Sequence, residues 1–169
     1  MSWETDTMYA AIVPLYASDR DRIRDHLLRL SPEDRSLRFA AGVVTDDSVC
    51  RYVDAIDLER DLVMGLVSKR GFVVGLVHGA VFDHRGRRHV EAAFSVDAAW
   101  RGVGFGTRLM EALLLHAAAL GDAVVLGQCA VRNRPMRRVF ERAGMAMTRS
   151  DDEWCARREW GAPCAASAA

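Results

Sequence analysis

The sequence predicts an α/β (α+β) fold in which helices cover both faces of a mostly antiparallel sheet. Helix caps dominate the first third of the chain, and residues 61–96 then carry three β-rich runs separated by the turn-like segments KRG and DHRGRR. The runs are apolar nearly throughout, which favours a sheet covered on both faces. A glycine-rich loop and alternating helices and strands follow. The expected order is β-α-α-α-β-β-β-α-β-α-β-β.

One short strand and a helix are predicted at the start. Residues 9–16 are apolar and include Pro14, which is typical of an edge strand because proline has no N–H to donate. Ser18, with Asp21 three residues on, predicts a helix start in the manner of an acidic capping box. The apolar stripe of this helix is Ile23, Leu27 and Leu30.

Two further helices precede the three runs. Ser31 is the expected cap of the first, with Pro32 at its first position and Asp34 closing the box. Thr45 is the expected cap of the second. Its buried face is predicted to be Val49, Tyr52, Val53 and Ile56.

The second half alternates helices and strands. Residues 106–120 are predicted to be helical, with Gly121 as the stop, and AVVLGQCA is the next buried strand. Residues 134–143 form the last helix, and MAMTRS with WCARREW predicts a hairpin. One side of the 106–120 helix is expected to carry Leu109, Leu113, His116, Ala117 and Leu120.

Length and charge limit the classes of function. The 169 residues fit one domain, placed at residues 9–160, with flexible tails expected at 1–8 and 161–169. The 23 basic residues balance 23 acidic ones, which disfavours nucleic acid as the main partner. DHRGRRH is interpreted as a solvated hairpin tip, with an acidic partner as the alternative.

The cysteines and the N-terminal segment predict a cytoplasmic protein. The four cysteines form no CxxC pair and have no metal-ligand spacing with the histidines, so no metal site and a reduced compartment are expected. Cys129 is expected to be a buried, inert thiol. The start lacks the features of a signal peptide, and no apolar run reaches the roughly 18 residues of a membrane span, so no membrane is expected as a partner.

The segment WRGVGFGTRLME combines a tight glycine loop with a helix start, an arrangement that binds anions through first-turn N–H groups and the helix dipole. The dinucleotide pattern G-x-G-x-x-G fails because Thr107 or Leu109 stands at its last glycine. A Walker loop fails because no lysine follows. The pattern that fits is R-x-x-G-x-G, from Arg101 to Gly106.

This loop, the element order and the segment RNRPMRRVFERAGM resemble the GCN5-related N-acetyltransferase (GNAT) family over about residues 9–160. LSPEDRSLRF, and Glu91 in the VEAAFSV strand, are similar to the bacterial branch that includes protein-lysine acetyltransferase domains. The resemblance implies a mixed sheet splayed at its middle. The residues at the places of the family's second signature are Asn133, Val139, Phe140, Gly144 and Met145.

The resemblance also implies acetyl-coenzyme A as cosubstrate, with its pyrophosphate in the glycine loop. Backbone groups of Phe94, Ser95 and Val96 would pair with the pantetheine arm and stabilise the oxyanion. Asn133 would contact the cofactor arm, or else serve as a plain helix cap. The loop residues implied in binding are Arg101, Gly102, Val103, Gly104, Phe105, Gly106 and Thr107, and Phe140 is included with them.

Glu91 is the candidate general base. An amine of the lysine type is almost wholly protonated at pH 7, so it must lose a proton before it attacks a thioester. We expect Glu91 to be buried in the sheet, where desolvation would raise its pKa toward the working pH. The alternative is a structural ion pair with Arg87 or Arg88.

The predicted activity is N-acetyl transfer to a primary amine by direct attack in a ternary complex. The acceptor stays open between a protein lysine, a protein N-terminus and a small amine. Phe140 stands where many family members have a tyrosine that protonates the leaving thiolate, so the alternative is an acyl-coenzyme A sensor with weak or no turnover. Apolar edge strands in the last hairpin also leave a homodimer open.

Overall fold

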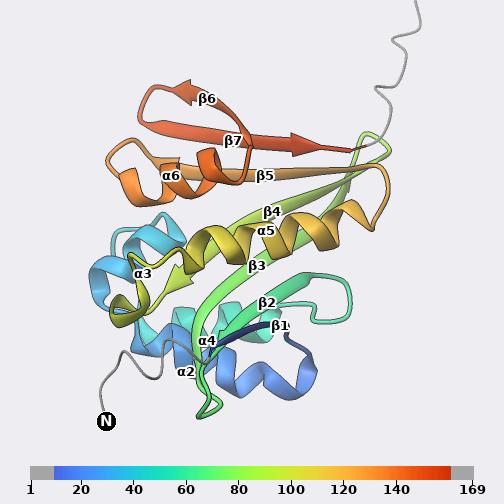
Figure 1. Cartoon of the computed structure of the whole chain (residues 1–169). Coiled ribbons are helices and arrows are strands. Elements are labelled where there is room, and N and C mark those ends of the chain that lie inside the picture. Colours follow the sequence, from blue (N-terminus) through green and yellow to red (C-terminus); the bar gives the residue numbers. More distant parts are fainter. Residues whose placement is uncertain (1–9, 161–169) are drawn as a thin grey trace, which may run out of the picture.

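The computed structural model describes residues 10–160, which form a mixed α/β fold around one seven-stranded sheet (Figure 1). The strand order is β1-β2-β3-β4-β5-β7-β6, and every neighbouring pair is antiparallel except β4 and β5. The predicted element order is confirmed. The strands are β1 (Ala11–Pro14), β2 (Leu62–Val67), β3 (Val73–His84), β4 (Arg87–Val96), β5 (Ala123–Ala130), β6 (Ala146–Ser150) and β7 (Glu153–Glu159).

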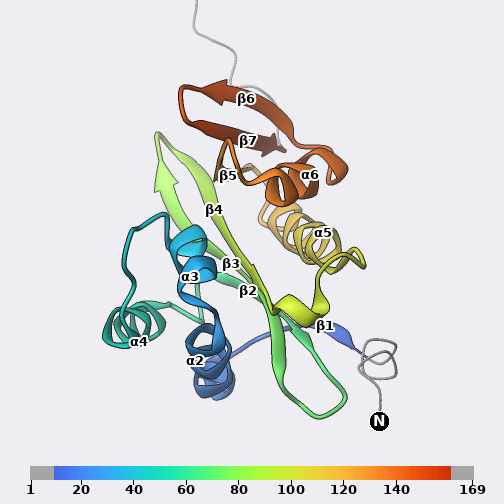
Figure 2. The same cartoon turned by 90° about the vertical axis from the view of Figure 1, so that its left-hand side faces the viewer.

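Helices cover both faces of the sheet, as predicted. Helices α2, α3 and α4 lie on one face and α5 and α6 on the other (Figure 2). No helix within residues 10–160 is long and apolar enough to cross a membrane. The helices are α2 (Arg20–Arg29), α3 (Pro32–Phe39), α4 (Asp46–Ala55), α5 (Phe105–Ala118) and α6 (Arg134–Arg142), with short 3-10 turns η1 (Ala17–Asp19) and η2 (Ala98–Trp100).

Two of the three predicted N-terminal caps are confirmed. The Ser31 hydroxyl accepts from the backbone N–H of the third residue of α3, and Thr45 does the same for α4. The prediction for Ser18 is wrong, because a 3-10 turn comes first and α2 begins only at Arg20. Within that turn the Asp19 carboxylate accepts from the Tyr16 N–H at 3.1 Å.

The sheet separates two apolar cores. The first lies under α2 and α4 and includes Ile23, Leu27, Val49, Val53 and Leu76; the second lies under α5 and α6 and includes Val77, Val90, Leu109, Leu113 and Phe140. Residues of β2 and β3 contribute to both cores, which explains their nearly continuous apolar runs. The first core contains no residue of β4, β5 or β7 among the described residues. On this face the apolar core therefore stops before β4, although α2 and α3 still contact that strand.

Strands β4 and β5 separate halfway along their length. They pair in parallel only where Arg88–Ala92 meets Ala123–Gly127. Beyond that point β4 continues to Val96 and β5 continues to Ala130, and neither continuation pairs with the other. The sheet thus opens as a V, as expected, and β4 leads from the open side through η2 into the glycine loop and α5.

Candidate active site

The glycine loop ends at an uncapped helix N-terminus. Gly102 and Gly104 have φ angles of +82° and +90°, a region that residues with a side chain rarely adopt, and nothing lies within 4 Å of a Cβ added at either position. Gly104 is the N-cap of α5, and no side chain caps this helix. Its first N–H groups are thus left for an anion, in a loop open enough for close approach.

Arg101 joins the loop to α3 and β4. Its Nε donates to the Val96 carbonyl at 2.8 Å, and its Nη2 lies 2.9 Å from Asp34 Oδ1. Partial burial acts to raise the pKa of Asp34, but the Arg101 guanidinium and the Ser31 hydroxyl hold that pKa below its ordinary value. A phosphate would therefore share Arg101 with Asp34.

The other loop residues divide between solvent and core. Val103 is 55% exposed beside the glycines. Phe105 is buried, with its ring 5.9 Å from that of Trp100, and anchors the start of α5 in the second core. Thr107 is half-buried in the first turn of the helix. Phe105 can therefore meet a ligand only through its backbone.

The open side of β4 carries the three residues predicted to face the cofactor arm. Phe94 and Ser95 pair with β3 on one side, but on the other side β5 has already diverged. This edge leaves strand N–H and C=O groups available to an extended ligand, apart from the Val96 carbonyl, which accepts from Arg101.

The Ser95 side chain is engaged elsewhere. Its Oγ lies 2.8 Å from Nε2 of the fully buried His26, whose Nδ1 lies 3.0 Å from Asp97 Oδ1. This polar chain joins α2 to the end of β4 and fixes the strand at the point where it diverges. The sequence pattern did not reveal His26, because it falls on the helical stripe next to Leu27.

Glu91 lies at the apex of the V, and our expectation that it is buried is wrong. Its side chain is exposed on the α2–α4 face, outside the apolar core under those helices. Its neighbours across the sheet are Ala80 on β3 and Leu126 on β5, one position before the last β4–β5 pair. Position, not desolvation, makes Glu91 a candidate base.

The alternative of a structural ion pair for Glu91 is also wrong. Arg87 pairs with Asp122 and with Glu159, and Arg88 donates to the Leu120 carbonyl. No ion pair or hydrogen bond involves the Glu91 side chain within the part of the chain described. The carboxylate is thus available to a ligand or to water.

A polar chain lies on the same face as Glu91. His78 Nε2 donates to Asp61 Oδ2 at 2.8 Å, and its Nδ1 accepts from the Tyr52 hydroxyl. Arg38 donates to that hydroxyl at 2.6 Å. Burial lowers the pKa of His78 and Arg38 acts in the same direction, while Asp61 and Glu91 oppose the shift. Tyr52, predicted only as a core residue, thus has a polar role.

This shift predicts that stability depends on pH through His78. The folded pKa is below the ordinary value of 6.5, so stability is fully present above about pH 6.5 and is lost as the pH falls through the folded pKa. The slope contributed is at most about 1.4 kcal/mol per pH unit. Urea unfolding from pH 7 to pH 5 should show a smaller slope in His78→Phe than in the wild type. His84→Asn, at an exposed histidine, is the control; equal slopes for wild type and His78→Phe would contradict the prediction.

Helix α6 borders the V on the side of α5. Asn133 is its N-cap and accepts from the Met136 N–H at 3.2 Å, so the plain helix cap is confirmed. A Cβ added at Gly106 would lie 3.1 Å from Val139 Cγ2, which shows how closely α6 packs on the first turn of α5. The two family-like segments therefore meet in space.

Phe140 is a core residue with no exposed surface. Its ring meets that of Phe94 edge-on at 6.2 Å and fills the space over Gly127, the last β5 residue that pairs with β4. Nearby, burial raises the pKa of Cys129 to about 11, so this thiol is protonated at neutral pH, as expected for an inert cysteine. No group of three potential metal ligands occurs within residues 10–160.

One family model matches most of the chain. The family model described as "Acetyltransferase (GNAT) family" matches residues 22–145. No curated protein matches the chain.

Solved structures share the fold at low sequence identity. The GNAT domain of S. lividans PAT is 21% identical with a TM-score of 0.73, covering 89% of this chain and 90% of that one. A phosphinothricin acetyltransferase from Sinorhizobium meliloti, in complex with AcCoA, is 17% identical with a TM-score of 0.70, covering 91% of this chain and 90% of that one. Spermidine N-acetyltransferase from Vibrio cholerae, in complex with CoA and spermine, is 16% identical with a TM-score of 0.68, covering 90% of this chain and 96% of that one. Because the family model matches most of the length of this chain, the chain belongs to the GNAT acetyltransferase family.

Proposed function

We propose that the protein is an acetyl-coenzyme A-dependent N-acetyltransferase that acts on a primary amine in a ternary complex. One observation carries the proposal: the exposed, unpaired Glu91 lies at the apex of the β4–β5 opening, whose β4 side leads directly to the uncapped N-terminus of α5. The anion site and the base are thus at two ends of one opening.

The residues present fit acetyl-coenzyme A. The loop from Gly102 to Gly106 and the first turn of α5 would hold the pyrophosphate, and the free edge of β4 from Phe94 to Val96 would hold the pantetheine arm. The cosubstrate supplies an acetyl group as a thioester. The half-buried Phe94 ring, which packs edge-on against the fully buried Phe140 ring, gives the opening an apolar side.

Glu91 receives the proton, directly or through one water. An ammonium gives its proton to the carboxylate, and the freed lone pair forms the N–C bond to the acetyl carbon as the C–S bond breaks. The electron pair leaves with sulfur, which takes a proton from solvent because Phe140 has no hydroxyl. The acetylated nitrogen releases its second proton to solvent and becomes a neutral amide. A thiol of ordinary pKa near 8.5 is a fair leaving group, so this route is slower without being closed.

Titration of the purified protein with acetyl-coenzyme A, followed by thiol release with a panel of amines and a lysine peptide, tests the proposal. Binding in the micromolar range with amine-dependent thiol release is the expected result. Absence of binding would overturn it. The same panel compares a protein lysine with small amines. Faster thiol release with the lysine peptide would support the resemblance to the protein-lysine acetyltransferase branch.

We expect Gly104→Ala to weaken acetyl-coenzyme A binding by about tenfold or more, because a side chain would stand where the pyrophosphate approaches the backbone. Gly121→Ala is a matched control. Gly121 has a similar φ of +85° and equally open surroundings, but lies at the other end of α5. Both variants should lose similar stability, and only Gly104→Ala should lose affinity in calorimetric titration. Equal affinity in the two variants would move the phosphate site elsewhere.

The second candidate function is an acyl-coenzyme A sensor with weak or no turnover. Phe140 favours it, because the buried phenyl ring cannot donate a proton to a leaving thiolate. A sensor would bind acetyl-coenzyme A and release no thiol with any amine in the panel. In that case Glu91→Gln would have no rate to lower.

A further inference from the structure

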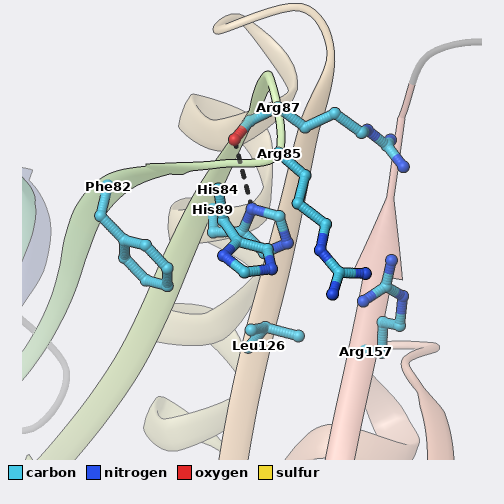
Figure 3. Close-up of a pocket in the computed structure, with 7 residues that line it drawn as sticks. All are labelled: Phe82, His84, Arg85, Arg87, His89, Leu126 and Arg157. Carbon is cyan, nitrogen blue, oxygen red and sulfur yellow. Dashed lines mark hydrogen bonds between the residues drawn. The ribbon is translucent and has the colours of Figure 1, made fainter.

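A cavity of about 500 Å³ lies on the α2–α4 face of the sheet, near the turn between β3 and β4 (Figure 3). Its aromatic wall consists of Phe82, His84 and His89. The Phe82 and His89 rings stack at 5.5 Å, and the His84 ring meets His89 edge-on at 5.3 Å. Leu126 of β5 adds an apolar lining (Figure 3). The cavity thus has an apolar and aromatic surface open to solvent.

The remaining lining residues are three arginines. Arg87 is neutralised, because Asp122 and Glu159 both pair with it. Arg157 shares Glu159 at 3.1 Å, and no carboxylate within residues 10–160 pairs with Arg85. Figure 3 shows the side chains of Arg85 and Arg157 extending toward one another. Arg85 has no carboxylate partner among the described residues, and Arg157 shares its carboxylate with Arg87, so these two guanidinium groups form a site for an anion.

The sheet register connects this anion site to the candidate base. Glu91 pairs with Leu126, and Leu126 pairs with Arg157, so the three form one row across β4, β5 and β7. Directly paired residues point to the same face of a sheet. Two strand spacings put the Cα atoms of Glu91 and Arg157 about 10 Å apart. A small molecule over Leu126 can therefore meet the carboxylate with one end and a guanidinium with the other.

We propose that the acceptor is a primary amine that carries a carboxylate or a comparable oxyanion, bound by Arg157 and Arg85 while its amine lies at Glu91. The inference rests on the proposed acetyltransferase function and specifies its substrate class. A polyamine fits poorly, because its second ammonium group would face the two guanidinium groups. The aromatic wall and Leu126 would contact the carbon chain between the two charged ends.

Matched acids and amides test the inference. We would measure kcat/KM by thiol release at saturating acetyl-coenzyme A for ω-amino acids from glycine to 6-aminohexanoate, each beside its uncharged carboxamide. At the best chain length the acid should exceed its amide by about tenfold or more, as a charge-assisted hydrogen bond implies. Lysine peptides with a neighbouring glutamate or glutamine distinguish an acidic protein side chain from a free amino acid as the source of the anion.

Substitutions of single arginines test whether the preference for acids over amides depends on Arg157 and Arg85. Arg157→Gln should reduce the ratio of acid to amide to about threefold or less, and Arg85→Gln should reduce it in part, because each loss of a guanidinium slows the acid more than the amide. Arg149→Gln is the control, because Arg149 is exposed on β6 but pairs with Trp154, three residues from Arg157 and thus on the other face. It should keep the wild-type ratio.

The outcomes separate the inference from the proposed function. If acetyl-coenzyme A binds and amines are acetylated, but no acid or acidic peptide exceeds its neutral partner, the inference is overturned and the transferase stands. A preference that Arg157→Gln leaves intact also overturns it. If acetyl-coenzyme A does not bind, the proposed function fails and the acceptor inference fails with it.

Discussion

Glu91→Gln is expected to lower kcat for acetyl transfer by about 100-fold or more and to leave the Kd for acetyl-coenzyme A unchanged. A positioned base contributes about 10²- to 10⁴-fold, and glutamine cannot accept the proton of the attacking ammonium. The side chain points away from the α5 face, so the phosphate and pantetheine contacts stay in place. Thiol release gives kcat, and calorimetric titration gives the Kd.

The control for this variant is Glu111→Gln. Glu111 is exposed on α5, on the other side of the sheet, and its replacement makes the same change in charge. It should keep the wild-type kcat. If Glu91→Gln keeps full activity as well, the amine loses its proton to another group, and the polar chain of Tyr52 and His78 on the same face becomes the next candidate.

Glu91 also shows what sequence patterning can supply. The strand and its apolar character were predictable, since residues 87–96 lie in a meander of apolar runs. The exposure of the Glu91 side chain was not predictable, because it depends on where α2–α4 lie over the sheet. A carboxylate among buried neighbours was therefore expected to be desolvated, when in fact its side chain is exposed, outside the apolar core under α2 and α4.

Local signals predicted local structure well. Ser31 and Thr45 cap their helices as expected, since a cap acts on N–H groups only two or three residues away. The prediction that Ser18 caps a helix was wrong because a 3-10 turn precedes α2, and Asp19 accepts a hydrogen bond within that turn. The order of strands and helices followed from periodicity and turn residues alone.

Nonlocal pairing could not be predicted from spacing. Arg87 was weighed as a partner for Glu91, four residues away, but it pairs with Asp122 and Glu159, which only the return of β5 and β7 to its side brings near. The row from Glu91 to Arg157 spans three strands distant in sequence. The acceptor inference therefore depends on register, which one sequence does not give.

Phe140→Ala is expected to lower the free energy of unfolding by about 3–5 kcal/mol, because it removes a fully buried ring and leaves a cavity. The backbone cannot close that cavity easily. A Cβ added at Gly127 would lie 2.6 Å from Cε1 and Cζ of the ring, so the strand already lies against it without a side chain, and Phe94 loses its edge-on partner. Urea unfolding at pH 7 measures the change.

Phe72→Ala removes the same ring at a site that is 58% exposed, and should cost less than about 1 kcal/mol. A cost for Phe140→Ala as small as that of Phe72→Ala would mean that the opening between β4 and β5 does not depend on this ring. A cost in the expected range would instead show that this stretch of β5 depends on the buried ring. The ring supports β5 where it diverges from β4, and that divergence forms the opening on which both the cofactor and the acceptor proposals depend.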